Sequence, residues 1–160
     1  MPESLVIRRE SPDQPEVVAL LDALDCYLAA LYPPEANYIL GVQELMAPEV
    51  SFFVARQAGR VVGTGAARRM PAGSATGGQA YGEVKRMYVD PALRGRRLGV
   101  QLLQAIENDL RDSGQTLALL ETGSDQAEAV RLYQRAGYTQ RGPFGGYPDN
   151  GLSVFYGKSL

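Results

Sequence analysis

The sequence predicts an α/β fold with a mixed sheet and helices on both faces of that sheet. Two observations carry this prediction. Segments with strand-like and helix-like hydrophobic spacing follow one another along the chain, and their order, β-α-α-β-β-β-α-β-α-β-β, is typical of a mixed sheet covered by helices. Because 160 residues with 45% hydrophobic content suit a single core, we expect one domain over residues 1–160.

The first half of the chain predicts a strand, two helices and a hairpin. A weakly alternating segment comes first, and Pro12-Asp13 then leads into an amphipathic segment. Tyr32-Pro33-Pro34 ends the first helix, Pro48 ends the second, and Ala58-Gly59 forms the hairpin turn. The expected elements are a strand at 4–9, helices at 15–31 and 36–46, and strands at 51–56 and 60–68.

The second half predicts an alternation of strands and helices after a loop at 71–78. Gly137-Tyr138 closes the last helix, and a loop rich in glycine and proline separates the final two strands. The expected elements are strands at 80–89 and 116–122, helices at 98–113 and 125–136, and strands near 138–141 and 152–158.

The turn from Arg94 to Gly99 joins a strand directly to a helix and is the most informative segment of the chain. The first N–H groups of a helix have no partners within it and lie at the positive end of its dipole. This turn therefore predicts a site for a phosphorylated ligand. No Gly-Lys-Ser/Thr triplet closes the turn, and the three-glycine spacing of dinucleotide-binding folds is missing, so neither of those motifs applies.

Composition excludes several kinds of chemistry. The chain has no histidine and a single cysteine, Cys26, which excludes histidine-based triads, histidine-ligated zinc and internal disulfides. We expect no metal, and we interpret Cys26, which lies among apolar residues, as a small buried core residue.

A net charge of −2 and a pI near 5.2 argue against a general nucleic-acid binder. No N-terminal leader and no apolar run of ~20 residues is present, so we expect a cytoplasmic protein outside the membrane.

A second motif, AVRLYQRAGY at 129–138, lies downstream of the turn. Together, these residues and the element order resemble the GNAT family of N-acetyltransferases, whose motifs have the forms Arg/Gln-x-x-Gly-x-Gly/Ala and A-x-x-L-Y-x-x-x-G-[FY]. One position departs from the family pattern, because Arg97 replaces the middle glycine of the first motif. The segments YPPEANYILG, FFVAR, GEVKRMYV, LLETG and GPFGGY further resemble a subgroup of small bacterial members with undefined acceptors.

The resemblance implies a mostly antiparallel central sheet and acetyl-CoA as cosubstrate. It places coenzyme A where the parallel strands at 84–89 and 116–122 separate. The pantetheine amides would then bond to main-chain groups of Met87 and Val89, for which plain core packing is the alternative. The expected cofactor-binding residues are Met87, Tyr88, Val89, Arg94, Gly95, Arg96, Arg97, Leu98, Gly99, Val100 and Gln126.

Acetyl transfer to an amine needs a base for the ammonium proton and an acid for the departing thiolate. By resemblance, Glu83 is the first choice of base, drawing the proton through water, and Glu121 is the second. Glu83 has an alternative interpretation as a strand-end partner of Lys85 or an arginine. Tyr133 matches the family's thiolate acid, although an amphipathic core tyrosine would fit the same helical spacing.

The acceptor is expected to be a primary amine of a small molecule or of a protein, attacked directly in a ternary complex. By resemblance, the first two helices and the last hairpin cover its site, and local packing is the alternative interpretation for their aromatic residues. The cations at 68, 69, 85 and 86 would attract an acceptor that carries a carboxylate or phosphate. The expected acceptor-binding residues are Tyr32, Tyr38, Lys85, Phe144 and Tyr147.

Two other functions remain open at this stage. A non-catalytic acyl-CoA sensor would keep the phosphate turn without turnover, and Glu83 and Tyr133 count against it. A nucleic-acid-binding module would use the basic RGRR patch, which the acidic balance of the chain disfavours. We therefore expect acetyl-CoA and an amine as partners and neither nucleic acid nor membrane, and we leave a homodimer open.

Overall fold

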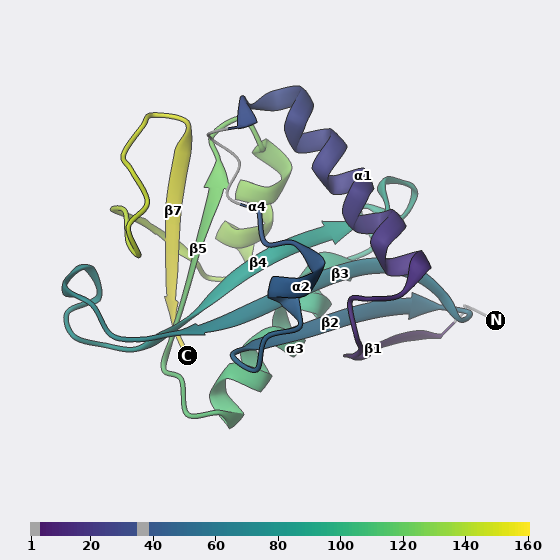
Figure 1. The fold of residues 1–160 in the computed structure, drawn as a ribbon, viewed down its shortest axis with the longest axis horizontal. Helices are drawn as coiled ribbons and strands as arrows, with labels where there is room; N and C mark the ends of the chain where they lie inside the picture. The colour runs from purple at the N-terminus through teal and green to yellow at the C-terminus, as the bar shows by residue number, and fades with distance from the viewer. Residues whose placement is uncertain (1–3, 35–38) are drawn as a thin grey trace.

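The computed structural model describes residues 4–34 and 39–160, and Figure 1 shows the arrangement of their elements. The expected mixed, mostly antiparallel sheet with helices on both faces is confirmed. In chain order the elements are β1 (Leu5–Arg9), α1 (Pro15–Leu31), α2 (Val42–Leu45), β2 (Val50–Gln57), β3 (Arg60–Met70), the 3-10 turn η2 (Ser74–Thr76), β4 (Tyr81–Val89), the 3-10 turn η3 (Pro91–Leu93), α3 (Leu98–Asp112), β5 (Leu117–Gly123), α4 (Ala127–Arg135), β6 (Thr139–Arg141) and β7 (Ser153–Ser159).

The seven strands of the described residues form one sheet in the order β1-β2-β3-β4-β5-β7-β6. All neighbouring pairs are antiparallel except β4 and β5, which are parallel. Parallel neighbours need a crossover between them, and here α3 supplies it. The single parallel pair therefore lies near the middle of the sheet, beside the turn at Arg94–Gly99.

The helices divide between the two faces of the sheet. In Figure 1, α1 crosses in front of the sheet and α3 lies behind it. Val17 and Leu21 of α1 pack with Leu45 of α2 and with apolar residues of β2 and β3. On the other face, α3 and α4 share a core with β4 and β5, in which Leu102, Ile106 and Leu110 are fully buried. The amphipathic spacing of α3 thus matches the face that it covers. The interpretation of Cys26 as a buried core residue was wrong, because Cys26 lies exposed on α1.

The second helix is shorter than the sequence predicted. Residues 39–41 are not helical, and α2 begins only at Val42; residues 36–38 of the expected helix lie outside the described residues. The Glu44 side chain accepts a hydrogen bond from the Gly41 backbone N–H at 3.2 Å. This contact fixes Gly41 as the residue before the helix, which explains why the apolar residues at 39 and 40 do not continue the helix backwards.

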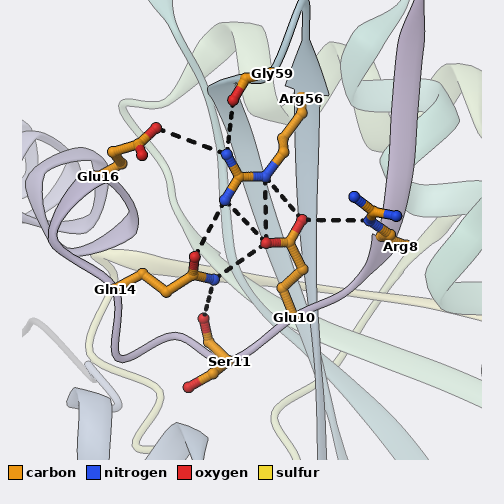
Figure 2. A network of polar contacts seen from close by, with 7 residues as sticks. All are labelled: Arg8, Glu10, Ser11, Gln14, Glu16, Arg56 and Gly59. Carbon is orange, nitrogen blue, oxygen red and sulfur yellow. Dashed lines mark hydrogen bonds and ion pairs between the residues drawn. The ribbon is translucent and has the colours of Figure 1, made fainter.

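A polar network connects the start of α1 to the β2–β3 hairpin (Figure 2). Arg56 Nε and Nη2 donate to the Glu10 carboxylate at 2.9 Å, and Nη1 donates to the Gly59 carbonyl at 2.7 Å. Gln14 donates to Glu10 and accepts from Arg56. All three guanidinium nitrogens of Arg56 donate to acceptors within the protein, so the network holds the loop after β1 in place.

Candidate active site

The parallel strands β4 and β5 pair over a very short distance and then separate. Their register contains only Gly82 opposite Ala118 and Glu83 opposite Leu119. Beyond Glu83, a register shift against β3 falls between Thr64 and Ala66. Arg86 lies there with a φ of 57°, and its carbonyl accepts a hydrogen bond from the Thr64 hydroxyl at 2.9 Å. This bulge bends β4 away from β5 and leaves strand-edge groups of β4 unpaired with β5.

The turn before α3 has a backbone that suits an anion. Gly95 and Arg97 have φ angles of 84° and 62°, and Arg97 is the residue just before the helix. Arg97 thus adopts the left-handed conformation that glycine takes most easily. The arginine at the position where the motif has glycine therefore keeps the shape of the turn, at some cost in backbone strain. The first N–H groups of the 15-residue α3 point along its axis from this turn.

A cleft of about 640 Å³ runs from the bulged part of β4 to this turn. Its lining contains every cofactor-binding residue expected from the sequence except Arg96. The structure therefore brings Met87, Tyr88 and Val89 of β4 together with the Arg94–Gly99 turn and with Gln126 at the start of α4. Gly99 lets the start of α3 pack closely against α4, because a Cβ at this position would lie 3.0 Å from Leu132 of α4.

A second, smaller cavity of about 90 Å³ opens where β4 and β5 separate, and we call it the acceptor cavity. Tyr133, Met87, Leu24 and Gln126 line both this cavity and the larger cleft, so the two spaces adjoin one another. The acceptor cavity is lined by Leu24, Leu28, Tyr32, Ile39, Val84, Lys85, Arg86, Met87, Glu121, Thr122, Gly123, Gln126, Tyr133 and Leu152.

Tyr133 lies at the junction of the two spaces. It projects from α4 and is 6% exposed. Burial, with a smaller contribution from the charge of Glu121, raises the pKa of the Tyr133 phenol. A raised pKa keeps the phenol protonated at neutral pH, and a protonated phenol can give its proton to a thiolate.

Glu121 lies on the wall of the acceptor cavity, near the end of β5. Its Oε2 accepts a hydrogen bond from the Ser153 hydroxyl at 2.7 Å. Burial raises the pKa of the Glu121 carboxyl, while the hydrogen bond from Ser153 and the charge of Lys85 oppose this shift. A carboxylate with a raised pKa is a stronger base than a solvated one.

Glu83 is held by two neighbours and is not among the residues that line the acceptor cavity. Its Oε2 accepts a hydrogen bond from the Tyr147 hydroxyl at 2.5 Å and lies 3.5 Å from Lys85 Nζ. Lys85 Nζ is also 2.7 Å from the Tyr147 hydroxyl, so the three groups form a closed ring of contacts. Burial and the neighbouring Glu83 carboxylate raise the pKa of Tyr147. The ion pair with Lys85, the alternative noted from the sequence, is therefore present.

The aromatic residues expected at the acceptor have different positions. Tyr32 lines the acceptor cavity, is 6% exposed, and its hydroxyl accepts a hydrogen bond from the Asp125 N–H at 3.0 Å. Phe144 is 2% exposed and packs edge-to-face on Tyr81, Tyr147 and Phe155, which is local packing. Tyr147 reaches Lys85 and Glu83 as described above. Tyr38 lies outside the described residues.

Some residues at the cleft and cavity were missed in the sequence. Arg131 and Arg135 line the large cleft one helical turn apart on α4, a spacing of four that the sequence displays. Ser153 contacts Glu121 from β7, a pairing that depends on strand order and had no local signal. Arg86 was noted for its charge, but its place on the cavity wall follows from the bulge.

Comparisons with known proteins show which family this chain is similar to. The model of the Acetyltransferase (GNAT) family matches residues 17–138. An IAA acetyltransferase of Azospirillum brasilense is 47% identical over 98% of this chain and 99% of its own. A Klebsiella pneumoniae protein assigned to the acyl-CoA N-acyltransferases has a solved structure with a TM-score of 0.77 and 34% identity, covering 98% of this chain and 97% of that one.

Two more distant structures share the fold and were solved with coenzyme A. An aminoglycoside 6'-N-acetyltransferase has a TM-score of 0.70 at 17% identity, with 96% of both chains covered, and the PaiA N-acetyltransferase of Thermoplasma acidophilum has a TM-score of 0.72 at 14% identity, with 98% and 99% covered. Separately, no helix in the described part of the chain is long and apolar enough to cross a membrane. The chain belongs to the GNAT family of acetyltransferases, enzymes that use acetyl-CoA as cosubstrate.

Proposed function

We propose that this acetyltransferase moves the acetyl group of acetyl-CoA to a primary amine by direct attack in a ternary complex. The observation that carries the proposal is the position of Tyr133, which lines both the large cleft and the acceptor cavity. Coenzyme A occupies the large cleft, with its pyrophosphate at the Arg94–Gly99 turn and its pantetheine along β4. The thioester then lies where the two spaces meet.

The proposed reaction uses one base and one acid. Glu121 takes a proton from the acceptor ammonium, because its carboxylate lies on the cavity wall and has a raised pKa. The free amine attacks the thioester carbonyl, the C–S bond breaks, and Tyr133 gives its proton to the thiolate. The attacking nitrogen, which carries two protons in the tetrahedral intermediate, returns one of them to the Tyr133 oxygen, and Glu121 releases the proton it took to solvent. Glu83, the first choice from sequence, contributes through its contacts with Tyr147 and Lys85. This assignment reverses the order in which the sequence ranked the two glutamates.

The acyl-CoA sensor remains the alternative, since it needs the large cleft and no chemistry. The acceptor cavity disfavours it, because a sensor has no use for a partly buried carboxylate of raised pKa beside a tyrosine. The single domain over residues 1–160 and the cytoplasmic location stay predictions, and a homodimer stays open.

The test measures release of the coenzyme A thiol from acetyl-CoA with a panel of primary amines. We expect amine-dependent release in the wild type. The double variant Gly95→Pro/Arg96→Glu should raise the KM for acetyl-CoA, because proline cannot adopt the φ of 84° at Gly95. Arg8→Glu is the matched control, since Arg8 is exposed on β1 and does not line the cleft. Tight acetyl-CoA binding without release of thiol to any amine would favour the sensor.

A further inference from the structure

We propose that the acceptor is a small amine that also carries a carboxylate, and that Arg86 and Lys85 bind this carboxylate. The inference rests on the acetyl transfer proposed above and names the class of its acceptor. It starts from the charges on the wall of the acceptor cavity. Glu121 supplies a carboxylate from β5, and Lys85 and Arg86 supply two cations from β4.

Lys85 and Arg86 line the same cavity although they are consecutive residues of a strand. Side chains of consecutive strand residues normally point to opposite faces of a sheet. The bulge at Arg86, with its φ of 57°, breaks this alternation. A positive φ in a non-glycine residue is strained, and such strain is found preferentially at functional sites. The bulge therefore gives the cavity two cations where a regular strand would give one.

The Arg86 guanidinium has one buried N–H group, that of Nε, that the described part of the protein does not satisfy. Its side chain is 5% exposed, and Nη1 donates to Asp25 Oδ1 at 2.5 Å. Nε is buried and has no hydrogen-bond partner among the described residues. A buried guanidinium with an unmade hydrogen bond is costly. A substrate carboxylate would add a second anion to this cation, and the planar shape of a carboxylate matches the guanidinium fork.

The charged groups around the two cations set how strongly they attract an anion. Lys85 faces Glu83 at 3.5 Å and the Tyr147 hydroxyl at 2.7 Å. Arg86 faces Asp25, whose side chain is 38% exposed and thus shares its charge with water. Since each cation already has an acidic neighbour, the substrate carboxylate is recognised by the planar N–H groups of the Arg86 guanidinium more than by an excess of positive charge.

The small volume of the acceptor cavity limits the size of the group that binds there. At about 90 Å³ it holds a small group, while the rest of an acceptor can extend through its open side. An amine directed to Glu121 and a carboxylate directed to Arg86 then lie close together in one molecule. A small amino acid has this combination of charges, and an amine with a long apolar chain does not.

The test compares small amino acids with their carboxamides, which keep the amine and lose the negative charge. Rates are expressed per free amine, because the two forms differ in amine pKa. We expect the wild type to have a kcat/KM for the acid that is roughly tenfold to hundredfold above that for the amide, as for a hydrogen-bonded charged group. Arg86→Gln and Lys85→Met should each remove most of this preference, because the kcat/KM of the acid falls more than that of the amide.

Two further variants separate this role from a structural one. Arg86→Lys keeps the positive charge beside Asp25 but loses the fork, so the preference should fall while the melting temperature is retained. Arg111→Gln is the control, since Arg111 lies on α3 and bonds Asn108, and the preference should be unchanged. Equal rates for acid and amide in the wild type would overturn the inference and leave the proposed function standing. Failure to acetylate any amine would overturn both.

Discussion

The polar network at the start of α1 and the acceptor cavity each contain a glutamate, and the pKa of the two carboxyls shifts in opposite directions. Glu10 accepts hydrogen bonds from Arg56 and Gln14 (Figure 2), and the Arg56 hydrogen bond lowers the pKa of its carboxyl. Glu121 accepts a hydrogen bond from Ser153, and burial raises its pKa. The two regions lie at opposite ends of α1, with Gln14 preceding the helix and Tyr32 following it.

The difference shows how the same side chain serves stability in one place and chemistry in another. A carboxylate with a bidentate arginine stays ionised and holds two segments together. A carboxylate that is desolvated and lacks such a partner binds protons more readily. The cavity therefore has a carboxyl that binds a proton more readily than an ordinary glutamate, and the network of Glu10 does not. Variants that act on one region should leave the other unaffected.

The largest effect on activity is expected for Tyr133→Phe. Loss of a general acid lowers kcat by roughly 100-fold or more, while the dissociation constant for acetyl-CoA stays within about twofold, because the ring still fills its site. Steady-state kinetics and calorimetry measure the two quantities. Wild-type kcat in this variant would show that Tyr133 is only a core residue.

The next effect concerns the closure of the acceptor cavity by α1. A Cβ at Gly123 would collide with the Tyr32 hydroxyl, so Gly123→Ala must displace Tyr32 and its hydrogen bond with the Asp125 N–H. We expect a loss of about 1 to 3 kcal/mol in the free energy of unfolding. Urea unfolding tests this, with Gly142→Ala as control, because a Cβ there has no neighbour within 4 Å. Equal losses in both variants would contradict the close contact.

The smallest effect is expected for Glu10→Gln, which should lower the melting temperature at pH 7 and leave kcat unchanged. Because the pKa of Glu10 is lowered in the folded state, its carboxylate contributes stability above the unfolded pKa of about 4.3, and this contribution is lost as pH falls through the lower folded pKa. The difference in melting temperature from wild type should therefore shrink in acid.

Glu16→Gln is the matched control for this change. Glu16 lies 3.7 Å from Arg56 and its side chain is 62% exposed, so its loss should matter less than that of Glu10. If both variants lowered the melting temperature equally at pH 7, the hydrogen bonds of Glu10 would contribute no more stability than the exposed ion pair of Glu16.

Sequence patterns could predict most helices and strands and the turn before α3, because these depend on local features. The helix 15–31 was predicted to the residue by its proline start and apolar spacing, and the Arg94–Gly99 turn was located by its place between a strand and a helix. The second helix was wrong in length, since the contact between Gly41 and Glu44 that starts it late is a side-chain hydrogen bond.

The acceptor cavity depends on long-range register, which periodicity does not contain. Arg86 joins Lys85 on the cavity wall only because a bulge forms against β3. Glu121 meets Ser153 only because β7 inserts beside β5. Likewise, Tyr147 and Phe144 lie three residues apart in one loop, yet one bonds Glu83 and the other packs in the core. Each of these placements requires knowledge of which strands are neighbours.

The most direct test of the account is a pH–rate profile of kcat/KM with one confirmed amine for the wild type, Glu121→Gln and Glu83→Gln. If Glu121 is the base, the wild-type rate rises with pH through a pKa above the usual range of glutamate. In Glu121→Gln the rise through this pKa should be absent, and kcat/KM should return toward the wild-type value only at higher pH, where the amine is deprotonated without a base. Glu83→Gln should keep the wild-type rise. The opposite result, a pH-rescued defect only in Glu83→Gln, would contradict the account and make Glu83 the base.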